Sequence, residues 1–172
     1  MRPLAGGRRH GPPVCLLVRP LETMHLRSFH DDDWRAICEI YDLGKPDEMR
    51  GVLDPKSLLP LLGDQAMTDL FRASQIVVAE EALRVVGFAG HRGSFITWLF
   101  VHPDFRRRGI AGALVRHLIA RLECPIMLNV VSGNTAARAL YAQLGFKVQR
   151  ELSGNFQGWP CKVCKLSYET VA

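Results

Sequence analysis

The chain has 172 residues, enough for one domain with a hydrophobic core, and its 48% apolar and 23% charged residues match an ordinary globular protein. No apolar run approaches the ~18 residues of a membrane span, and the longest N-terminal run, 14–18, is too short for the ~7–15-residue core of a secretory signal. These features argue against a membrane function and predict a cytoplasmic protein.

The net charge of +5 is unevenly distributed along the chain. Residues 1–24 carry four arginines against one glutamate, whereas the rest carries 18 basic and 16 acidic residues. The one dense basic cluster of that remainder, 106–108, lies between a predicted strand and a predicted helix, where a small phosphate ligand fits better than a duplex. We therefore expect no nucleic-acid partner.

Residues 1–23 are rich in Gly, Pro and Arg and lack sustained periodicity. They are interpreted as a disordered extension, or as an upstream start that is not used in the cell. Met24 is followed at once by alternating residues, 25–29, that predict a first strand. The predicted domain is therefore 24–172, and the working protein is expected to begin near Met24.

The next segment predicts helices. Asp31–Asp33 supply carboxylates for the start of a helix that Gly44 and Pro46 are expected to end. Residues 47–74 then predict an insertion of short helices, where we expect the substrate to be chosen. These helices are predicted over 49–53, 55–62 and 65–73.

Three β-rich runs follow and predict an antiparallel meander over 75–80, 84–90 and 94–101. A helix over 110–122 then presents a broad apolar face. The apolar run 125–131 is reached through this helical crossover, so it is predicted to lie parallel to the strand before the helix.

The C-terminal region predicts one more helix and two strands. Asn134 caps a helix that runs to Leu144, and Gly145 stops it. The last strands are predicted over 146–152 and 162–168, joined by a long loop over 153–161.

The stretch that leads into helix 110–122 has the pattern of an anion site. Pro103 and three arginines, Arg106–Arg108, precede Gly109, whose missing Cβ lets a ligand approach the backbone. The first-turn N–H groups of such a helix have no intrahelical partner and carry the positive end of the helix dipole. Together these features predict a polyanion site, most naturally for a pyrophosphate.

Two common phosphate loops do not match this stretch. A Walker loop requires Gly-x4-Gly-Lys-Ser/Thr, but Gly112 is followed by Ala113 and Leu114, which argues against an NTPase. A dinucleotide fingerprint requires Gly-x-Gly-x-x-Gly, which the run from Gly109 to Gly112 lacks. What remains is Arg-x-x-Gly-x-Ala over 106–111.

This pattern resembles motif A of the GNAT N-acetyltransferase superfamily, whose acyl-coenzyme A loop reads Arg/Gln-x-x-Gly-x-Gly/Ala. The second half resembles motif B of the same family, with a strand around Asn129, then Asn134, Tyr141 and the triplet 144–146. The resemblance covers roughly 24–170. It implies an α/β (α+β) single-domain fold with a mixed, mostly antiparallel sheet of about seven strands, a central parallel pair splayed around the cofactor, and four or more helices.

The resemblance also implies a donor, acetyl-CoA, and the residues that bind it. Asn134 would contact the pantetheine arm or hold the splayed strands, and Tyr141 would stand near the sulfur as general acid. The other cofactor-binding residues would be the strand backbone of Leu99, Phe100 and Val101, the arginines Arg106, Arg107 and Arg108, and the N–H groups from Arg107 through Gly109, Ile110 and Ala111 to Gly112.

The spacing of Asn134 and Tyr141 agrees with this assignment, because seven residues make about two helical turns and place both on one groove. Tyr141 also fits the apolar face of its helix, so core packing alone is the alternative. Asn134 is expected to cap the helix in either case.

The residue that takes the proton from the acceptor is not identified. Several peptide-acetylating members of the family carry Glu in the middle of the motif B strand, where this chain has Asn129, which cannot accept a proton. Asp47, Glu48 and His102 qualify only by their chemistry. A surface carboxylate or a packed histidine is the simpler interpretation of each.

The five cysteines lack the even, regular spacing of a disulfide framework. Cys161 and Cys164 have CxxC spacing but lie in a predicted strand, where residues three apart point to opposite faces. No second CxxC or nearby His completes a metal site, so no metal is expected.

The sequence thus predicts an acetyl-CoA-dependent N-acetyltransferase that acts on a primary amine by direct attack in a ternary complex. A small-molecule amine is the first hypothesis, because Asn129 departs from the peptide-acetylating pattern. The segment 45–74 and the loop 153–160, with Phe156 and Trp159, are expected to wall the acceptor site. A peptide N-terminal or lysine acetyltransferase and a non-catalytic acyl-CoA-binding module stay open as alternatives, and the oligomer expected, if any, is a homodimer.

Overall fold

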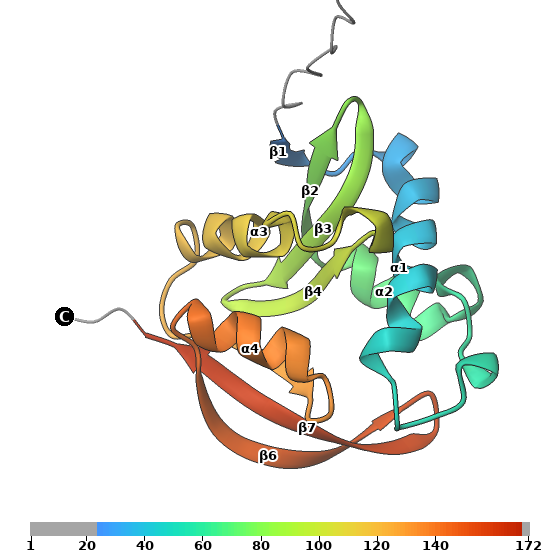
Figure 1. Cartoon of the computed structure of the whole chain (residues 1–172), viewed down its shortest axis with the longest axis vertical. Coiled ribbons are helices and arrows are strands. Elements are labelled where there is room, and N and C mark those ends of the chain that lie inside the picture. The colour runs from blue at the N-terminus through green and yellow to red at the C-terminus, as the bar shows by residue number, and fades with distance from the viewer. Residues whose placement is uncertain (1–23, 170–172) are drawn as a thin grey trace, which may run out of the picture.

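A computed structural model describes residues 24–169, so the predictions for 1–23 lie outside the described residues. Seven strands form one mixed sheet in the order β1-β2-β3-β4-β5-β7-β6 (Figure 1). The strands are β1 His25–Ser28, β2 Gln75–Glu81, β3 Arg84–Arg92, β4 Phe95–Val101, β5 Ile126–Val131, β6 Lys147–Phe156 and β7 Trp159–Tyr168. The α-helices are α1 Trp34–Glu48, α2 Gln65–Arg72, α3 Ile110–Ile119 and α4 Thr135–Gln143.

The sheet is antiparallel except between β4 and β5, as the crossover through α3 predicted. These two strands match at only two positions, Phe95 with Met127 and Ile96 with Leu128. Beyond them the strands diverge, while β5 continues to pair with β7 as far as Val131. The divergence separates β1–β4 from β5–β7, and both parts remain in one sheet.

Two apolar cores lie on opposite faces of the sheet. On one face α3 and α4, which lie in front of the sheet in Figure 1, pack Leu114 and Tyr141 into a cluster with Ile96 and Leu128. On the other face α1 and α2 pack against β2–β4 in an aromatic cluster. That cluster includes Tyr41, Phe71, Phe88 and Trp98.

The predicted end of α1 at Gly44 and Pro46 is wrong, because the helix continues to Glu48. Gly44 is a site of close approach, since a Cβ there would lie 2.9 Å from the ring of Phe100 on β4. The helix passes Pro46 and still closes the bond from Met49 N–H to the carbonyl of Lys45, 3.0 Å. Tertiary packing on β4 therefore decides the length of this helix.

The segment between α1 and α2 is less helical than predicted. Residues 49–53 form turns, and two 3₁₀ helices, Pro55–Ser57 and Leu61–Gly63, replace the expected helix over 55–62. Pro60 explains the break, because it lacks an N–H donor and restricts the residue before it. The third helix was predicted correctly and appears as α2.

The predicted long loop over 153–161 is also wrong. Strands β6 and β7 continue to Phe156 and Trp159, and a two-residue turn of Gln157 and Gly158 joins them. Both turn residues have positive φ, 50° and 87°, which matches the right-handed twist of the flanking strands. Asn155 Oδ1 accepts a 2.8 Å bond from the N–H of Gly158 and stabilises the turn.

The helix ends predicted in the C-terminal half are confirmed. Asn134 Oδ1 accepts a 3.1 Å bond from the N–H of Ala137 at the start of α4, and Gly145 has φ +93° just beyond its end. Within residues 24–169 no helix is both long enough and apolar enough to cross a membrane.

Candidate active site

The divergence of β4 from β5 exposes backbone polar groups. The N–H of His102 bonds to the carbonyl of Val86, 2.9 Å, and the β3–β4 register continues without a shift from Val101 to Trp98. In an antiparallel ladder alternate residues face the same neighbour, so Phe100 is turned to β3. Leu99 and Val101 accordingly direct their N–H and C=O groups to the side from which β5 has departed.

The loop before α3 turns its backbone N–H groups toward a common side. Arg107 and Gly109 have φ of 64° and 82°, and Gly109 is the N-cap of α3. Successive residues of alternating handedness form the concave arrangement of N–H groups that binds anions. The first helical bond runs from Ala113 N–H to Gly109 C=O, 3.0 Å, so the N–H groups of 110–112 have no intrahelical acceptor.

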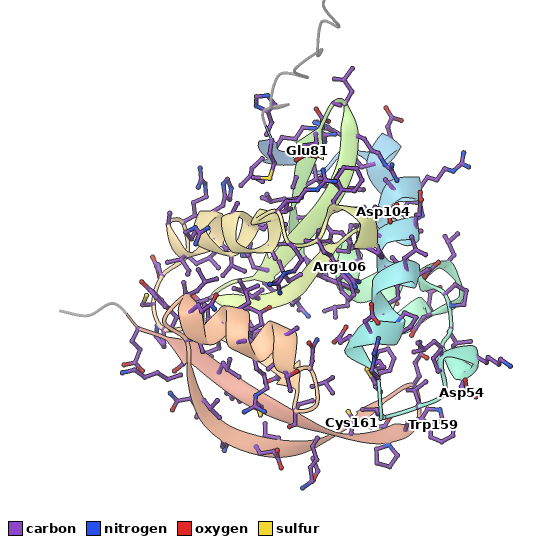
Figure 2. All side chains as sticks on the ribbon, viewed as in Figure 1. Asp54, Glu81, Asp104, Arg106, Trp159 and Cys161 are labelled. Atoms are coloured by element: carbon purple, nitrogen blue, oxygen red, sulfur yellow. The ribbon has the colours of Figure 1, made fainter. Side chains whose placement is uncertain are left out.

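The arginine triplet is divided among different partners. Arg106 pairs with Asp47 at 2.6 Å and donates through Nε to the carbonyl of Val101, 3.4 Å; Figure 2 shows it between α1 and α3. Arg108 lies 3.5 Å from Glu81. Arg107 is exposed and has no ion-pair partner among residues 24–169. Only Arg107 of the three is therefore uncommitted.

A fourth arginine near the start of α3 was missed by the sequence motif. A Cβ on Gly112 would lie 3.1 Å from Nη2 of Arg116, so the guanidinium lies over the first turns of the helix. Arg116 belongs to the last turn of α3, and its side chain extends back toward the N-terminal part of the helix. The spacing of four residues from Gly112 was the signal available in the sequence.

Tyr141 lies in the apolar core between α3 and α4. Its ring packs edge-on to Phe146, with centroids 5.4 Å apart, so it belongs to the α3–α4 core. Burial raises the pKa of its hydroxyl above the usual 10.0, and the negative charge of Glu48 raises it further. The tyrosine hydroxyl is thus protonated, and it interacts electrostatically with Glu48 at the C-terminal end of α1.

The end of α1 carries an ion pair between the buried Lys45 and the half-buried Glu48, one of the acid–base candidates of the sequence. Lys45 Nζ lies 3.0 Å from Oε2 of Glu48, and the lysine side chain is 9% exposed. The ammonium also lies 4.0 Å from the ring centroid of Phe156 in the β6–β7 hairpin and 5.9 Å from that of Phe100 in β4. Burial of a lysine requires such partners, because an unpaired ammonium is costly to remove from water.

The other acid–base candidates lie differently. Asp47 is paired with Arg106 and Arg50, each at 2.6 Å, and these bonds hold the pKa of its carboxyl below the usual value. His102 is buried beside Arg84, 3.2 Å, and accepts the N–H of Asp104, so it is the packed strand-end histidine. Neither side chain offers an available base.

Asn129 lies on the sheet face opposite to α3 and α4. It lines a cavity of about 780 Å³ with Thr97 and Ile96, at the point where β4 and β5 separate. The far end of the cavity is formed by residues of α2 and of the β3–β4 turn. The side chain of Asn129 is exposed and opens onto this face.

The predicted acceptor walls come together in the structure. Gln157 at the hairpin turn donates to Asp64, 2.7 Å, and accepts from the N–H of Leu59, 3.2 Å. Phe156 covers Lys45, whereas Trp159 is 47% exposed; Figure 2 shows Trp159 at the hairpin, near the end of α1. The hairpin is thus tied to the segment between α1 and α2.

Both cysteines of the CxxC pair lie in β7. Cys164 is buried with its sulfur 3.4 Å from Oγ of Ser132, whereas Cys161 is half-buried near Lys45 and Glu48. Within residues 24–169 no group of three metal-ligating side chains is found.

Residues 72–148 match the family model described as an acetyltransferase (GNAT) domain. An acetyltransferase from Pectobacterium atrosepticum is 35% identical over 129 residues, which are 72% of this chain and 88% of the relative. A GCN5-related N-acetyltransferase structure from Rhodopseudomonas palustris superimposes with a TM-score of 0.70 at 20% identity, over 86% of this chain and 96% of that one. The structure of yncA from Salmonella typhimurium with its cofactor acetyl-CoA superimposes with a TM-score of 0.62 at 20% identity, over 87% of this chain and 96% of that one.

The two motifs, the seven-stranded sheet with one diverging parallel pair, and these similarities agree. The expected fold is confirmed, and the chain belongs to the GNAT family of acetyltransferases, enzymes that transfer an acyl group to nitrogen.

Proposed function

We propose that this protein transfers the acetyl group of acetyl-CoA to the primary amine of a small molecule, by direct attack within a ternary complex. The observation that carries the proposal is the divergence of β4 from β5 beside the start of α3. It leaves the backbone of Leu99 and the N–H of Val101 without a neighbouring strand on the β5 side, beside the N–H groups at Gly109. The carbonyl of Val101 accepts from Nε of Arg106.

The residues of this region fit acetyl-CoA. Leu99 and Val101 would pair with the amide groups of the pantetheine arm, in the way that an added strand pairs with a sheet edge. The N–H groups of 107–112 would bind the pyrophosphate, and Arg107 and Arg116 would add positive charge. Asn134 has its side-chain oxygen bonded to Ala137, so its amide nitrogen would be the group that contacts the pantetheine.

Acetyl-CoA supplies an activated thioester, and the protein supplies donors on either side of it. A backbone N–H of β4 would stabilise the negative charge that develops on the carbonyl oxygen. Tyr141 would donate its proton to the departing sulfur. The raised pKa of its hydroxyl supports this role, because it keeps the phenol protonated throughout the neutral pH range.

Two observations support a small acceptor. Asn129 stands where several peptide-acetylating relatives carry Glu. Gln157 ties the β6–β7 hairpin to Asp64 and Leu59, so the acceptor side is bounded by two segments that contact each other. An extended peptide would have to pass beside this contact.

A cytoplasmic location is part of the proposal. Within residues 24–169 Cys38, Cys161 and Cys164 form no disulfide bond, which is the usual state in proteins of a reducing compartment.

The test is calorimetric binding of acetyl-CoA followed by thiol release across a panel of L-amino acids, spermidine, tyramine, an aminoglycoside and an alanine-initiated tripeptide. Turnover of a small amine is expected. Turnover of the tripeptide alone would replace the small-molecule acceptor by a peptide. Binding of acetyl-CoA without turnover of any amine would favour a non-catalytic acyl-CoA-binding module.

A further inference from the structure

We infer that Glu48 is the catalytic base, which accepts the proton of the acceptor ammonium, and that Lys45 is the residue that positions it. The inference rests on the proposed function, because it assigns a role at the same site. Glu48 would accept the proton that Asn129 cannot accept.

The first support is the place where Glu48 is held. Its partner Lys45 contacts three elements: α1 itself, Phe100 of β4 and Phe156 of the β6–β7 hairpin. Phe100 directly follows Leu99, whose backbone faces the divergence of β4 from β5. The carboxylate is therefore fixed at the end of α1 that borders the proposed reaction centre.

The second support is what Glu48 faces. From α4 the hydroxyl of Tyr141 faces Glu48: burial raises its pKa, and the negative charge of Glu48 raises it further. From β7 the thiol of Cys161 faces both members of the ion pair: burial raises its pKa, Lys45 lowers it, and Glu48 raises it by a smaller amount. Within α1 the charged or titratable neighbours are Lys45 and Tyr41. Tyr141 belongs to the core on the α3–α4 face of the sheet, whereas α1, which carries Glu48, packs on the opposite face.

The third support is the state of the other nearby carboxylates. Asp47 is held by Arg106 and Arg50, Asp42 accepts the N–H of Leu61 at 2.8 Å, and Asp64 accepts from Met67 and Gln157. Glu48 has Lys45 as its one recorded ion-pair partner among residues 24–169, and its side chain is 27% exposed. It is bound firmly enough to be oriented and is still open to a ligand.

Burial of the Lys45 ammonium is an expensive way to stabilise a helix end, since an apolar residue of similar volume often does so equally well. Orientation of a reactive group is a reason to retain it. The contacts of Lys45 with Phe156, Phe100 and Tyr41 hold the ammonium in place, and the ammonium holds Glu48 in turn.

Two protons leave the acceptor nitrogen during the reaction. The acceptor ammonium gives one proton to an oxygen of Glu48, and the nitrogen lone pair then forms the bond to the acetyl carbon. The C–S bond breaks, the sulfur takes the proton of Tyr141, and the second proton of the nitrogen returns to the phenolate. Glu48 releases its proton to water, so one acetamide, one thiol and one proton are formed.

The test compares Glu48→Gln with the wild type, using the panel amine that has the highest kcat/KM. Loss of a general base lowers turnover by about 10²–10⁴-fold, so kcat is expected to fall within that range at pH 7. The activity of the variant should then rise about tenfold per pH unit up to the pKa of the amine, because only the free amine reacts. The dissociation constant of acetyl-CoA should change less than threefold. A kcat within threefold of wild type, or an unaltered pH profile, would overturn the inference.

Two further variants control the test. Glu39→Gln changes an exposed carboxylate on the same helix and should leave kcat unchanged. Glu48→Gln leaves Lys45 buried without its partner, so the double variant Lys45→Met/Glu48→Gln removes the unpaired charge and should show the same loss of kcat with a restored melting temperature. If the double variant regained activity, Glu48 would not be the base. If wild-type protein turned over none of the panel amines, the proposed function itself would fail instead.

Discussion

The guanidinium of Arg106 lies 2.6 Å from the carboxylate of Asp47, and this pair joins the loop before α3 to the C-terminal end of α1. Arg106 also donates to the carbonyl of Val101 at the end of β4. One side chain therefore links three elements around the proposed acetyl-CoA site. The sequence motif predicts that Arg106 binds a phosphate. In the structure Arg106 joins these three elements through its side chain.

Arg107 and Arg106 are expected to respond differently to removal. Arg107→Ala removes an exposed, uncommitted cation beside α3 and should weaken acetyl-CoA binding by about 3–10-fold with an unchanged melting temperature. Arg106→Ala should lower the melting temperature, because Asp47 and the carbonyl of Val101 lose their donor. Calorimetry with acetyl-CoA and thermal melting measure both effects. If both variants lost the same acetyl-CoA affinity and kept the wild-type melting temperature, the structural role of Arg106 would be contradicted.

Gly109 has φ +82° at the start of α3, so a Cβ there is strained and also faces the proposed pyrophosphate site. Gly109→Ala should cost about 1 kcal/mol of stability and reduce acetyl-CoA affinity at least tenfold. Gly51→Ala is the matched control, since Gly51 has φ +79° and open space around it. The control should show a similar stability loss with unchanged affinity. If both variants lost the same acetyl-CoA affinity, Gly109 would not belong to the acetyl-CoA site.

Tyr141→Phe should lower kcat by about 10²-fold or more and leave the acetyl-CoA dissociation constant unchanged, because the ring packing stays and the proton donor is lost. Tyr168→Phe is the control, as its ring packs on the same Phe146, with centroids 5.4 Å apart. The raised pKa of Tyr141 also means that wild-type activity should not decline as pH rises toward 10, the ordinary tyrosine value. Stopped-flow thiol release over pH 6–10 measures both effects, and an unchanged kcat in Tyr141→Phe would dismiss it as the acid.

Asp33 is expected to stabilise the fold in a pH-dependent way. It is buried, and a double hydrogen bond from Arg27, at 2.7 and 2.9 Å, holds the pKa of its carboxyl below the usual 3.8. The ionised form is therefore favoured by folding, so its contribution is complete above about pH 4 and is lost as the pH falls further. Asp33→Asn should cost about 2 kcal/mol at pH 7, or roughly 4–8 °C in melting temperature.

The exposed Asp32→Asn is the control for Asp33 and should melt like the wild type at every pH. As the pH falls from 5 to 3 in a thermal melting series, the difference between wild type and Asp33→Asn should shrink. A difference that stays constant over this range would show that the pair with Arg27 contributes nothing through ionisation.

The local features of the site were predictable because each depends on neighbours in the chain. Gly109 provides the left-handed turn into α3, Asn134 caps α4, and Gly145 ends it, and each of these conformations follows from the side chain, or its absence, at that position. The parallel placement of β5 beside β4 followed from the crossover rule for helical connections. Together with the two motifs these features were sufficient for the family.

The errors occurred where distant segments decide the outcome. Gly44 and Pro46 have the composition of a helix end, but the packing of Gly44 against Phe100 extends α1 to Glu48. The run 153–161 has the composition of a loop, yet the turn at Gln157 continues both strands and lets Phe156 reach Lys45.

The sequence by itself determined the family of this protein and predicted its donor site, because the groups proposed to bind acetyl-CoA are backbone N–H groups whose geometry is set within a few residues. The groups proposed for the acceptor side are brought together only by the tertiary structure. Lys45 and Glu48 lie on α1, Tyr141 on α4 and Phe156 in the β6–β7 hairpin, and no spacing along the chain indicates that they meet. Their proximity results from the twist of one sheet and from burial of the lysine, which are properties of the folded molecule.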